Sequence, residues 1–287
     1  MEKPQHLAIL GYGLMGSSLA LALRERGYTG RLLGYARKEQ TRNRALEMNI
    51  ADEVFDDPAD AVREADLIVI CVPIWTTARL AESIVPALRP GAVVTDVGST
   101  KSRLQEAMEP LFTGSQACFV GSHPIAGSEQ TGIDAGHPDL YEGRLTVVCP
   151  SAGTPDAAKE AVTSLWRNAG SEVVEMSAAE HDAMLASTSH LPHMVAAAVA
   201  RSVAGDDPEK RADFCGTGFK DTTRVASGSA DMWVDIIDTN RAALEAELDR
   251  FHGELQGLID ILRGGNSDDI RRWLEEAAAD RNRILEL

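Results

Sequence analysis

A short apolar run followed by three spaced glycines places the strongest constraint on how this chain folds. Residues 7–10 read Leu-Ala-Ile-Leu, and Gly11, Gly13 and Gly16 follow with the spacing Gly-X-Gly-X-X-Gly. Between a strand and a helix, this spacing is typical of a turn that holds a dinucleotide pyrophosphate. It allows a tight turn, a close approach to the phosphates and close packing of helix on strand. A glycine-rich turn without a ligand is the alternative, but the surrounding strand and helix patterns favour dinucleotide binding.

The backbone at the start of the following helix is the predicted phosphate site. The first N–H groups of a helix have no partner inside it, and they point toward an anion at its positive end. In this chain those groups belong to Leu14, Met15 and Gly16. We therefore expect these residues, together with Gly11 and Gly13, to bind the cofactor.

The residues after the next predicted strand bear on the choice of cofactor. A carboxylate that binds the adenine ribose 2′-hydroxyl is expected about 20 residues beyond the glycines. The chain has Ala36-Arg37-Lys38 at this point, with no carboxylate. Arg37 and Lys38 carry the charge that a 2′-phosphate needs, which favours NADP and leaves NAD open. Two solvent-exposed charges at the start of a helix are the equal alternative.

Strands and helices alternate through the first part of the chain. Apolar runs predict strands, and the amphipathic segments between most of them predict helices. We expect strands at residues 6–10, 31–35, 67–72, 92–97, 117–121, 145–149 and 172–175, and helices at residues 14–26, 76–88 and 156–169. Continuous apolar runs such as residues 67–72 are buried on both faces, as in a parallel sheet covered by helices. This part is therefore predicted to be a doubly wound α/β domain.

After about residue 177 the pattern becomes helical. Residues 192–204 are almost wholly apolar, which predicts a helix buried on all sides. Apolar residues recur at steps of four and three between residues 239 and 263, a narrow seam suited to another helix. A last helix should have Ser267 as its N-cap, with Asp268 and Asp269 complementing the helix dipole. Such seams pack either against a second copy of the chain or within one chain.

Composition excludes several classes of protein. Hydrophobic residues make up 44% of the 287 residues and charged residues 25%, as in soluble globular proteins. No apolar run approaches the roughly 18 residues that a membrane span needs. The net charge of −16 argues against nucleic acid or an anionic membrane as the main partner, so local cations must bind any anionic substrate. The four cysteines show no CxxC pair and the first residues resemble no secretory signal, which together predict a cytoplasmic protein.

Polar segments follow two of the predicted strands. Residues 96–101 come at the end of one strand, and residues 121–129 come at the end of the next. Ligands of open α/β sheets bind beyond the carboxyl ends of the strands, so Ser99 and His123 should face the nicotinamide side of the cleft. A further polar segment, residues 187–193, stands at the entry to the apolar helix.

These segments resemble the prephenate/arogenate dehydrogenase family, which makes the precursor of tyrosine. The resemblance covers nearly the whole chain. It rests on the glycine motif, residues 96–101, HPIAGSE at residues 123–129, His181-Asp182, SHLPH at residues 189–193, and residues 218–224 followed by Met232-Trp233. It implies a Rossmann-type α/β domain at residues 1–177 and an all-helical domain at residues 178–287 that binds substrate and forms a homodimer.

The chemistry of the family implies roles for five residues. Prephenate loses a hydride from C4 to NAD(P)+, and loss of the ring carboxylate as CO2 makes the ring aromatic. His123 matches the histidine that accepts the 4-hydroxyl proton, and Ser99 matches a serine that orients the hydroxyl and the imidazole. Arg224 matches the arginine that binds a substrate carboxylate, while Ser189 and His193 match further pocket positions.

The same residues also have alternative roles that do not involve catalysis or substrate binding. His123 precedes a proline and could be a structural turn residue. His190 and His193 stand three apart, which is also a metal-ligand spacing, but no cysteine or carboxylate accompanies them at a telling spacing and no metal is predicted. Arg224 could instead belong to a surface ion pair.

Some neighbouring residues stay outside the predicted site. Lys220 and Asp221 stand beside Arg224 and could tune it. Glu129 and Trp233 fit the family pattern but could be purely structural. His190 is expected to be a packed, hydrogen-bonded residue at the helix start.

Three other functions are the alternatives to oxidation of prephenate. Arogenate differs from prephenate only in carrying an amine in place of the side-chain carbonyl, and the uncharged Gln130 offers no partner for an ammonium. A β-hydroxyacid dehydrogenase would need a lysine base in the helical part, and the HLPH segment fits it poorly. A dinucleotide-sensing regulator without catalysis is the third.

Overall fold

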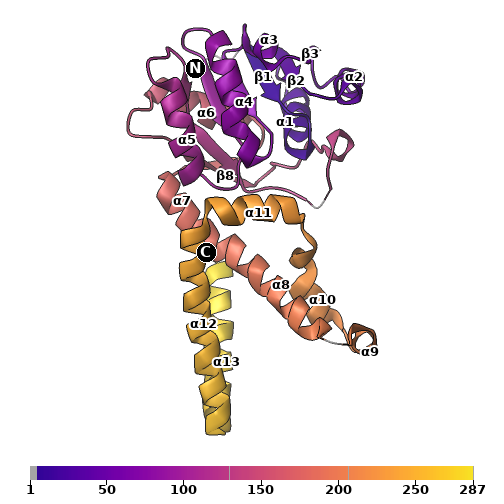
Figure 1. Cartoon of the computed structure of the whole chain (residues 1–287), viewed down its shortest axis with the longest axis vertical. Helices are drawn as coiled ribbons and strands as arrows, with labels where there is room; N and C mark the ends of the chain where they lie inside the picture. Colours follow the sequence, from indigo (N-terminus) through magenta and orange to yellow (C-terminus); the bar gives the residue numbers. More distant parts are fainter. Residues whose placement is uncertain (1–4, 129, 206, 287) are drawn as a thin grey trace. The chain divides into compact units, whose positions relative to one another are not determined.

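The computed structural model describes residues 5–128, 130–205 and 207–286, so Glu129 lies outside the described residues (Figure 1). The chain divides into two compact units, Met1–Arg241 and Ala242–Leu287. None of the helices in the described ranges is long and apolar enough to span a membrane.

A six-stranded parallel sheet forms the centre of the first unit. Its strands are β1 (His6–Leu10), β2 (Arg31–Tyr35), β3 (Glu53–Phe55), β4 (Leu67–Ile70), β5 (Val93–Asp96) and β6 (Cys118–Phe119). They lie in the order β3-β2-β1-β4-β5-β6. The strand order reverses direction at β1, so the carboxyl ends of β1 and β4 mark the topological switch point, where ligands of such sheets bind.

Both faces of this sheet are buried. Alternate residues of β1 enter two different cores, Leu7 and Ile9 on one face and Ala8 and Leu10 on the other. The covering helices are α1 (Leu14–Glu25), α2 (Glu39–Glu47), α3 (Pro58–Val62), α4 (Ile74–Ile84), α5 (Ser102–Phe112) and α6 (Asp156–Asn168), with a 3₁₀ turn η1 (Val85–Ala87) after α4. Because strands covered on both sides must be apolar throughout, the continuous apolar runs are explained and the predicted doubly wound fold is confirmed.

A second, three-stranded sheet holds the polar segment that contains His123. It consists of β7 (Gly121–Pro124), β8 (Leu145–Cys149) and β9 (Glu172–Glu175), and the 3₁₀ turn η2 (Ile133–Ala135) lies between β7 and β8. β7 pairs antiparallel with β8, so that His123 lies opposite Val147, and β9 runs parallel to β8. The prediction of one strand at residues 117–121, ended by the motif, is therefore wrong. The chain bends between β6 and β7, and the motif itself forms a strand.

The rest of the first unit is helical. It contains α7 (Ala178–Leu185), a single π-helical turn η3 (Ala186–His190), α8 (Leu191–Ala204), α9 (Pro208–Ala212), α10 (Thr217–Thr223), η4 (Arg224–Ser227) and α11 (Ala230–Thr239). α8 was predicted to be buried on all sides, and this prediction is wrong for the single chain, where only His193 and Ala196 are buried. Its neighbours η3, η4, α9 and α10 cover part of its surface and leave the remainder accessible.

The second unit consists of two helices, α12 (Arg241–Gly264) and α13 (Ser267–Leu285), so the predicted helical character of the C-terminal part is confirmed. Asp268 and Asp269 lie in the first turn of α13, as predicted. The N-cap is Asn266 rather than Ser267, because the Asn266 side chain accepts a hydrogen bond from the Asp268 amide.

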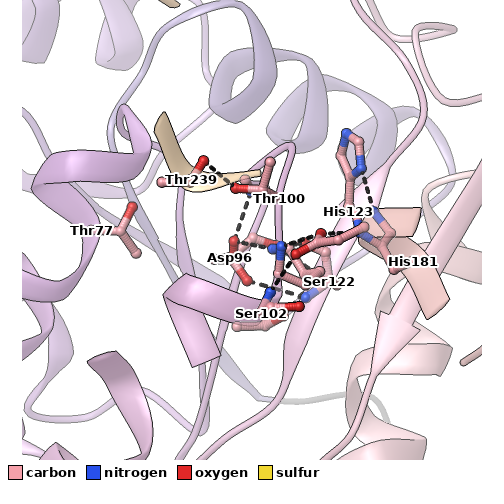
Figure 2. Close-up of polar contacts among 12 residues, drawn as sticks. Thr77, Asp96, Thr100, Ser102, Ser122, His123, His181 and Thr239 are labelled. Atoms are coloured by element: carbon pink, nitrogen blue, oxygen red, sulfur yellow. Dashed lines mark hydrogen bonds and ion pairs between the residues drawn. The ribbon is translucent and has the colours of Figure 1, made fainter. Parts of the chain in front are cut away.

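A buried ion pair joins the two sheets. The ammonium of Lys101 lies 2.5 Å from the carboxylate of Asp96 at the end of β5, and it donates to the carbonyl of Ser122 in β7 at 2.8 Å. The other oxygen of Asp96 accepts the Ser122 amide. Both charged side chains are 1% exposed. This cluster fixes β7, and therefore His123, against the parallel sheet (Figure 2).

We predict that Asp96→Asn lowers the free energy of unfolding by about 3–5 kcal/mol, because it leaves the Lys101 ammonium buried without its counter-charge. The double variant Asp96→Asn/Lys101→Met should be less destabilised than the single variant. Urea unfolding monitored by circular dichroism measures both. A loss below about 1 kcal/mol for Asp96→Asn would show that the pair does not hold the sheets together.

Candidate active site

The three glycines after β1 each meet the steric requirement that their spacing predicts. Gly11 has φ +111°, and a Cβ there would lie 2.5 Å from the carbonyl oxygen of Cys71. A Cβ on Gly16 would lie 2.0 Å from the carbonyl oxygen of Gly11, so only glycine lets α1 pack this closely on the turn. Gly13 has open space where its Cβ would be. A phosphate could approach the backbone through that space.

The start of α1 fits an anion. Gly13 is the N-cap residue and provides no side-chain cap. The first backbone bond back to it comes from Ser17, 3.0 Å from the Gly13 carbonyl oxygen. The N–H groups of Leu14, Met15 and Gly16 come before that bond and have no acceptor within the helix. The cradle therefore fits the pyrophosphate of a dinucleotide.

The loop after β2 presents two free cations. Ala36 is buried, while Arg37 and Lys38 are exposed just before α2. Neither cation forms an ion pair within the described part of the chain. Arg42 holds the loop in place by donating to the carbonyl oxygens of Ala36 and Arg37 at 3.0 Å each. The loop is therefore shaped by Arg42, and the charges of Arg37 and Lys38 face solvent.

His123 is a buried residue of β7, the strand that packs beside β5. It is 8% exposed, and its Nδ1 lies 2.9 Å from Nε2 of His181 (Figure 2). Its Nε2 makes no hydrogen bond to any residue that the structure describes. Burial, with smaller contributions from His181, Lys101 and His190, lowers the pKa of His123 well below 6.5. The ring is therefore neutral at neutral pH, with one nitrogen held and the other available.

His181 and Asp182 continue the chain of contacts from His123. Nδ1 of His181 lies 2.8 Å from Oδ1 of Asp182, and both residues are buried in α7. Asp182 also accepts the backbone amides of Lys101 at 2.7 Å and Ser102 at 2.8 Å, at the start of α5. Burial raises the pKa of Asp182, but the hydrogen bonds from His181 and the two amides outweigh it and the net pKa is lowered.

The sequence did not place His181 and Asp182 in the site. Their contact with His123 joins positions 58 residues apart, and no local spacing reveals it. One available signal was the pair itself: two adjacent titratable residues in the first turns of a helix whose N-terminus is fixed by a capping box at Ser177 and Glu180. Two adjacent titratable side chains are buried only when other parts of the chain form hydrogen bonds or ion pairs with them.

Ser99 lies in the loop after β5, half-buried, and β5 packs beside β7. Its hydroxyl makes no hydrogen bond within the residues that the structure describes, so the partner of His123 is His181 and not Ser99. The loop is shaped at either side of Ser99. The Gly98 amide donates to Asp96, and the Thr100 hydroxyl donates to Thr239 at 2.7 Å.

The three residues predicted to bind substrate lie on α8 and on two short helical turns that pack against it, η3 and η4. Ser189 is half-buried in η3. His193 is buried in α8, where its ring stacks on Trp233 with the centroids 3.5 Å apart and the planes 17° apart. Arg224 is exposed in η4, which packs against α8. Arg224 forms no ion pair with the described residues, so its guanidinium is free to bind an anion. Lys220 is likewise exposed, in α10.

His190 is packed inside the site, as expected. It is 1% exposed and its Nδ1 lies 3.2 Å from Nδ2 of Asn240, which also donates to the carbonyl oxygen of Asp182. Burial lowers the pKa of His190 to about 4. Among the described residues, no group of three or more histidine, cysteine, aspartate or glutamate side chains is arranged to hold a metal ion.

Comparisons with known proteins agree with this geometry. A family model described as prephenate dehydrogenase, nucleotide-binding domain, matches residues 19–175, and one described as prephenate dehydrogenase, dimerization domain, matches residues 177–276. A cyclohexadienyl dehydrogenase from Zymomonas mobilis is 34% identical over 276 residues, which cover 95% of this chain and 94% of the relative.

Two solved structures resemble the chain over almost its whole length. One is a prephenate dehydrogenase from Aquifex aeolicus in complex with hydroxyphenyl propionate and NAD+, with a TM-score of 0.91, 30% identity and 98% of each chain covered. The other is an arogenate dehydrogenase from Synechocystis, with a TM-score of 0.86, 30% identity, and 97% of this chain and 99% of the other covered. The glycine cradle, the buried neutral histidine and the two family models together show that this chain is a nicotinamide-dependent oxidoreductase and belongs to the prephenate dehydrogenase family.

Proposed function

We propose that this chain oxidatively decarboxylates prephenate to 4-hydroxyphenylpyruvate, with transfer of a hydride to NAD(P)+. The observation that carries the proposal is the buried neutral imidazole of His123, which has one nitrogen held by His181 and the other available to a substrate. It lies beside the carboxyl end of β5, on the edge of the sheet where the glycine cradle also lies. A proton acceptor next to a dinucleotide site is the arrangement that oxidation of an alcohol requires.

The reaction balances with one proton acceptor. NAD(P)+ held at the glycine cradle would supply the acceptor for the hydride that leaves C4. His123 takes the hydroxyl proton, and the electron pair of the broken O–H bond forms the carbonyl. The ring carboxylate then leaves as CO2, its bonding electrons make the ring aromatic, and the resulting phenolate regains the proton from His123. The reaction therefore neither releases nor consumes a proton, and His123 returns to its starting form.

His123 and Ser99 are the proposed catalytic residues. The lowered pKa of His123 keeps the imidazole in the neutral form that can accept a proton. Ser99 has a hydroxyl without a partner in the described part of the chain, on a loop fixed at Gly98 and Thr100. That hydroxyl is available to bind the substrate hydroxyl and orient it toward His123.

Arg224, His193 and Ser189 are the proposed substrate-binding residues. Prephenate carries two carboxylates, and a chain with a net charge of −16 repels such a dianion unless local cations bind it. The unpaired guanidinium of Arg224 can hold a carboxylate through two parallel hydrogen bonds. His193 stacks on Trp233 next to the turn that carries Arg224, and this packing supports a pocket wall at that point.

The proposal also includes the choice of cofactor, the oligomeric state and the domain boundary. The two cations at Arg37 and Lys38, free of ion pairs among the described residues, support binding of the NADP 2′-phosphate. Exposed apolar side chains on α12 and α13, including Leu262, Leu274 and Ile284, support a homodimer through the helical part. The end of β9 at Glu175 and the capping box that opens α7 support the division into residues 1–177 and 178–287. The cytoplasmic location stays a prediction from the sequence.

Of the other candidate functions, oxidation of a β-hydroxyacid fits the structure less well, whereas oxidation of arogenate fits it equally. A β-hydroxyacid dehydrogenase would need a buried lysine base in the helical part, but Lys210 and Lys220 are both exposed. The ammonium of the buried Lys101 is already paired with Asp96. Arogenate would use the same catalytic residues as prephenate, so it remains the alternative substrate, and activity distinguishes the two.

The proposed function is tested by assaying prephenate and arogenate, each with NAD+ and NADP+. We expect prephenate to be oxidised with release of CO2, and NADP+ to be used at least as well as NAD+. Arg37→Ala should lower kcat/KM for NADP+ by about 10–100-fold, the loss expected for a charge-assisted hydrogen bond. Use of NAD+ by the same variant is the internal control. No turnover of prephenate would refute the function, and a strong NAD+ preference would refute the cofactor assignment.

We predict that His123→Asn lowers kcat by about 10²–10⁴-fold and leaves binding of cofactor and prephenate intact, because only proton transfer is lost. In the unmodified enzyme, kcat/KM should fall as the pH drops through the His123 pKa, since the protonated ring accepts no proton. Because that pKa is lowered, the midpoint of the fall should lie below pH 6.5. An unchanged kcat in the variant, or a midpoint well above 6.5, would contradict the assignment.

We predict that Arg224→Ala raises KM for prephenate by about 10–100-fold and changes kcat much less. The carboxylate that Arg224 binds is the same in the ground state and the transition state, so uniform binding is lost. Arg201→Ala is the matched control, because Arg201 is another exposed arginine of the helical part without an ion pair among the described residues. Equal KM values in the two variants would place the anion elsewhere.

A further inference from the structure

A continuous series of hydrogen bonds leads from a buried carboxylate to the proposed base. Asp182 lies 2.8 Å from Nδ1 of His181, and Nε2 of His181 lies 2.9 Å from Nδ1 of His123. His181 is 0% exposed and Asp182 is 4% exposed, so water does not compete for these contacts. Each ring nitrogen along the series must therefore be either a donor or an acceptor, and its neighbour decides which.

The backbone settles the role of Asp182. The amides of Lys101 and Ser102 can only donate, and both donate to its carboxylate. These bonds favour the ionised form, in agreement with its lowered pKa. An ionised carboxylate accepts hydrogen bonds and donates none, so the hydrogen between Asp182 and His181 belongs to Nδ1 of His181.

The role of His123 follows from that of His181. A neutral imidazole with hydrogen on Nδ1 has a lone pair on Nε2, so His181 accepts a hydrogen bond from Nδ1–H of His123. His123 then carries its lone pair on Nε2, the nitrogen without a partner among the described residues. If His181 were instead cationic, its Nε2–H would donate to His123 and force the hydrogen of His123 onto Nε2. That form of His123 could not accept the substrate proton.

We propose that His181 and Asp182 are positioning residues that hold His123 in the tautomer with its lone pair on Nε2 and stabilise the imidazolium it becomes. The inference rests on the proposed function in assigning the substrate hydroxyl proton to that nitrogen. The positive charge that His123 gains on protonation also requires a nearby negative charge. Lys101 and His190 also face His123, and the Lys101 ammonium opposes protonation of the ring. Asp182 supplies the compensating negative charge through His181.

Asp182→Asn tests the direction of the hydrogen bonds. The carboxylate accepts the Ser102 amide on Oδ2, and it accepts the Lys101 amide on Oδ1, the oxygen that also faces Nδ1 of His181. With the asparagine oxygen accepting the Ser102 amide, its NH2 group takes the place of Oδ1 and faces Nδ1 of His181, and the Lys101 amide loses its acceptor. His181 then carries its hydrogen on Nε2 and donates to His123, so the hydrogen of His123 moves to Nε2. We expect kcat to fall by about 10²–10⁴-fold, as for other bases held in the wrong tautomer, with KM for prephenate nearly unchanged.

His181→Gln separates orientation from charge. The glutamine amide oxygen can still accept Nδ1–H of His123, but it cannot link the ring to Asp182 as imidazole does. We expect His123 to keep its tautomer and kcat to fall by about tenfold, less than in Asp182→Asn. A greater loss of kcat in His181→Gln than in Asp182→Asn would contradict control of the tautomer by Asp182.

The tautomer is measured directly by ¹⁵N NMR of the full chain labelled at its seven histidines, with His123→Asn identifying the signal of His123. We expect Nδ1 of His123 to be protonated and Nε2 to be unprotonated in the unmodified protein, and the reverse in Asp182→Asn. The opposite tautomer in the unmodified protein would overturn the proposal. Because this readout needs no substrate, a failure of the proposed function, seen as no turnover of prephenate, is distinguished from a failure of this inference.

Ser171→Ala is the matched structural control. It removes a buried hydroxyl that accepts a hydrogen bond from the Thr146 hydroxyl at 2.9 Å, and that belongs neither to the loop of Ser99 nor to the series of hydrogen bonds. The tautomer of His123 and kcat should both be unchanged. Thermal unfolding of each variant establishes that it folds. If Ser171→Ala lowered kcat as much as Asp182→Asn, or if folded Asp182→Asn kept full kcat, the proposed role of Asp182 would be refuted.

Discussion

The carboxylate of Asp182 accepts the first two amides presented at the start of α5 and the imidazole of His181. A buried charge is tolerated only when such donors surround it, and here the donors come from both the nucleotide-binding part and the helical part of the first unit. The orientation of His123 depends on this arrangement, because His181 links the two. The same contact that stabilises the fold therefore also sets which nitrogen of His123 is free to react.

The residue proposed as the proton acceptor is buried, whereas the residues proposed to bind anions are exposed. Around His123 the residues are buried, and desolvation keeps the imidazole neutral. Around Arg224, Arg37 and Lys38 the residues are exposed, and the cations keep their charges free of ion pairs among the described residues. An acidic protein that binds an anionic substrate and an anionic cofactor needs such local cations, since its overall field repels both.

The sequence predicted those parts of the fold that depend on local patterns. The bounds of β1, β2, β8 and β9 agree with the predicted ranges, because each is a short strand-like run bounded by turn residues. β7 was missed because Gly121-Ser122-His123-Pro124 has no strand pattern, and its burial comes from Asp96, Lys101 and Trp166. The contact of His181 with His123 was missed because it also depends on tertiary packing, which brings together residues 58 positions apart. α8 reads as a fully buried helix, yet in a single chain its neighbours cover only part of it.

We propose above all that Nε2 of His123 accepts the hydroxyl proton of the substrate. A crystal structure of the chain with NAD(P)+ and a hydroxylated substrate analogue tests it most directly. We expect the analogue hydroxyl at about 2.6–3.2 Å from Nε2 of His123, with Nδ1 still hydrogen-bonded to His181 and C4 of the nicotinamide over the reacting carbon. A hydroxyl bound to another base, with the His123 ring turned away from the nicotinamide, would contradict it.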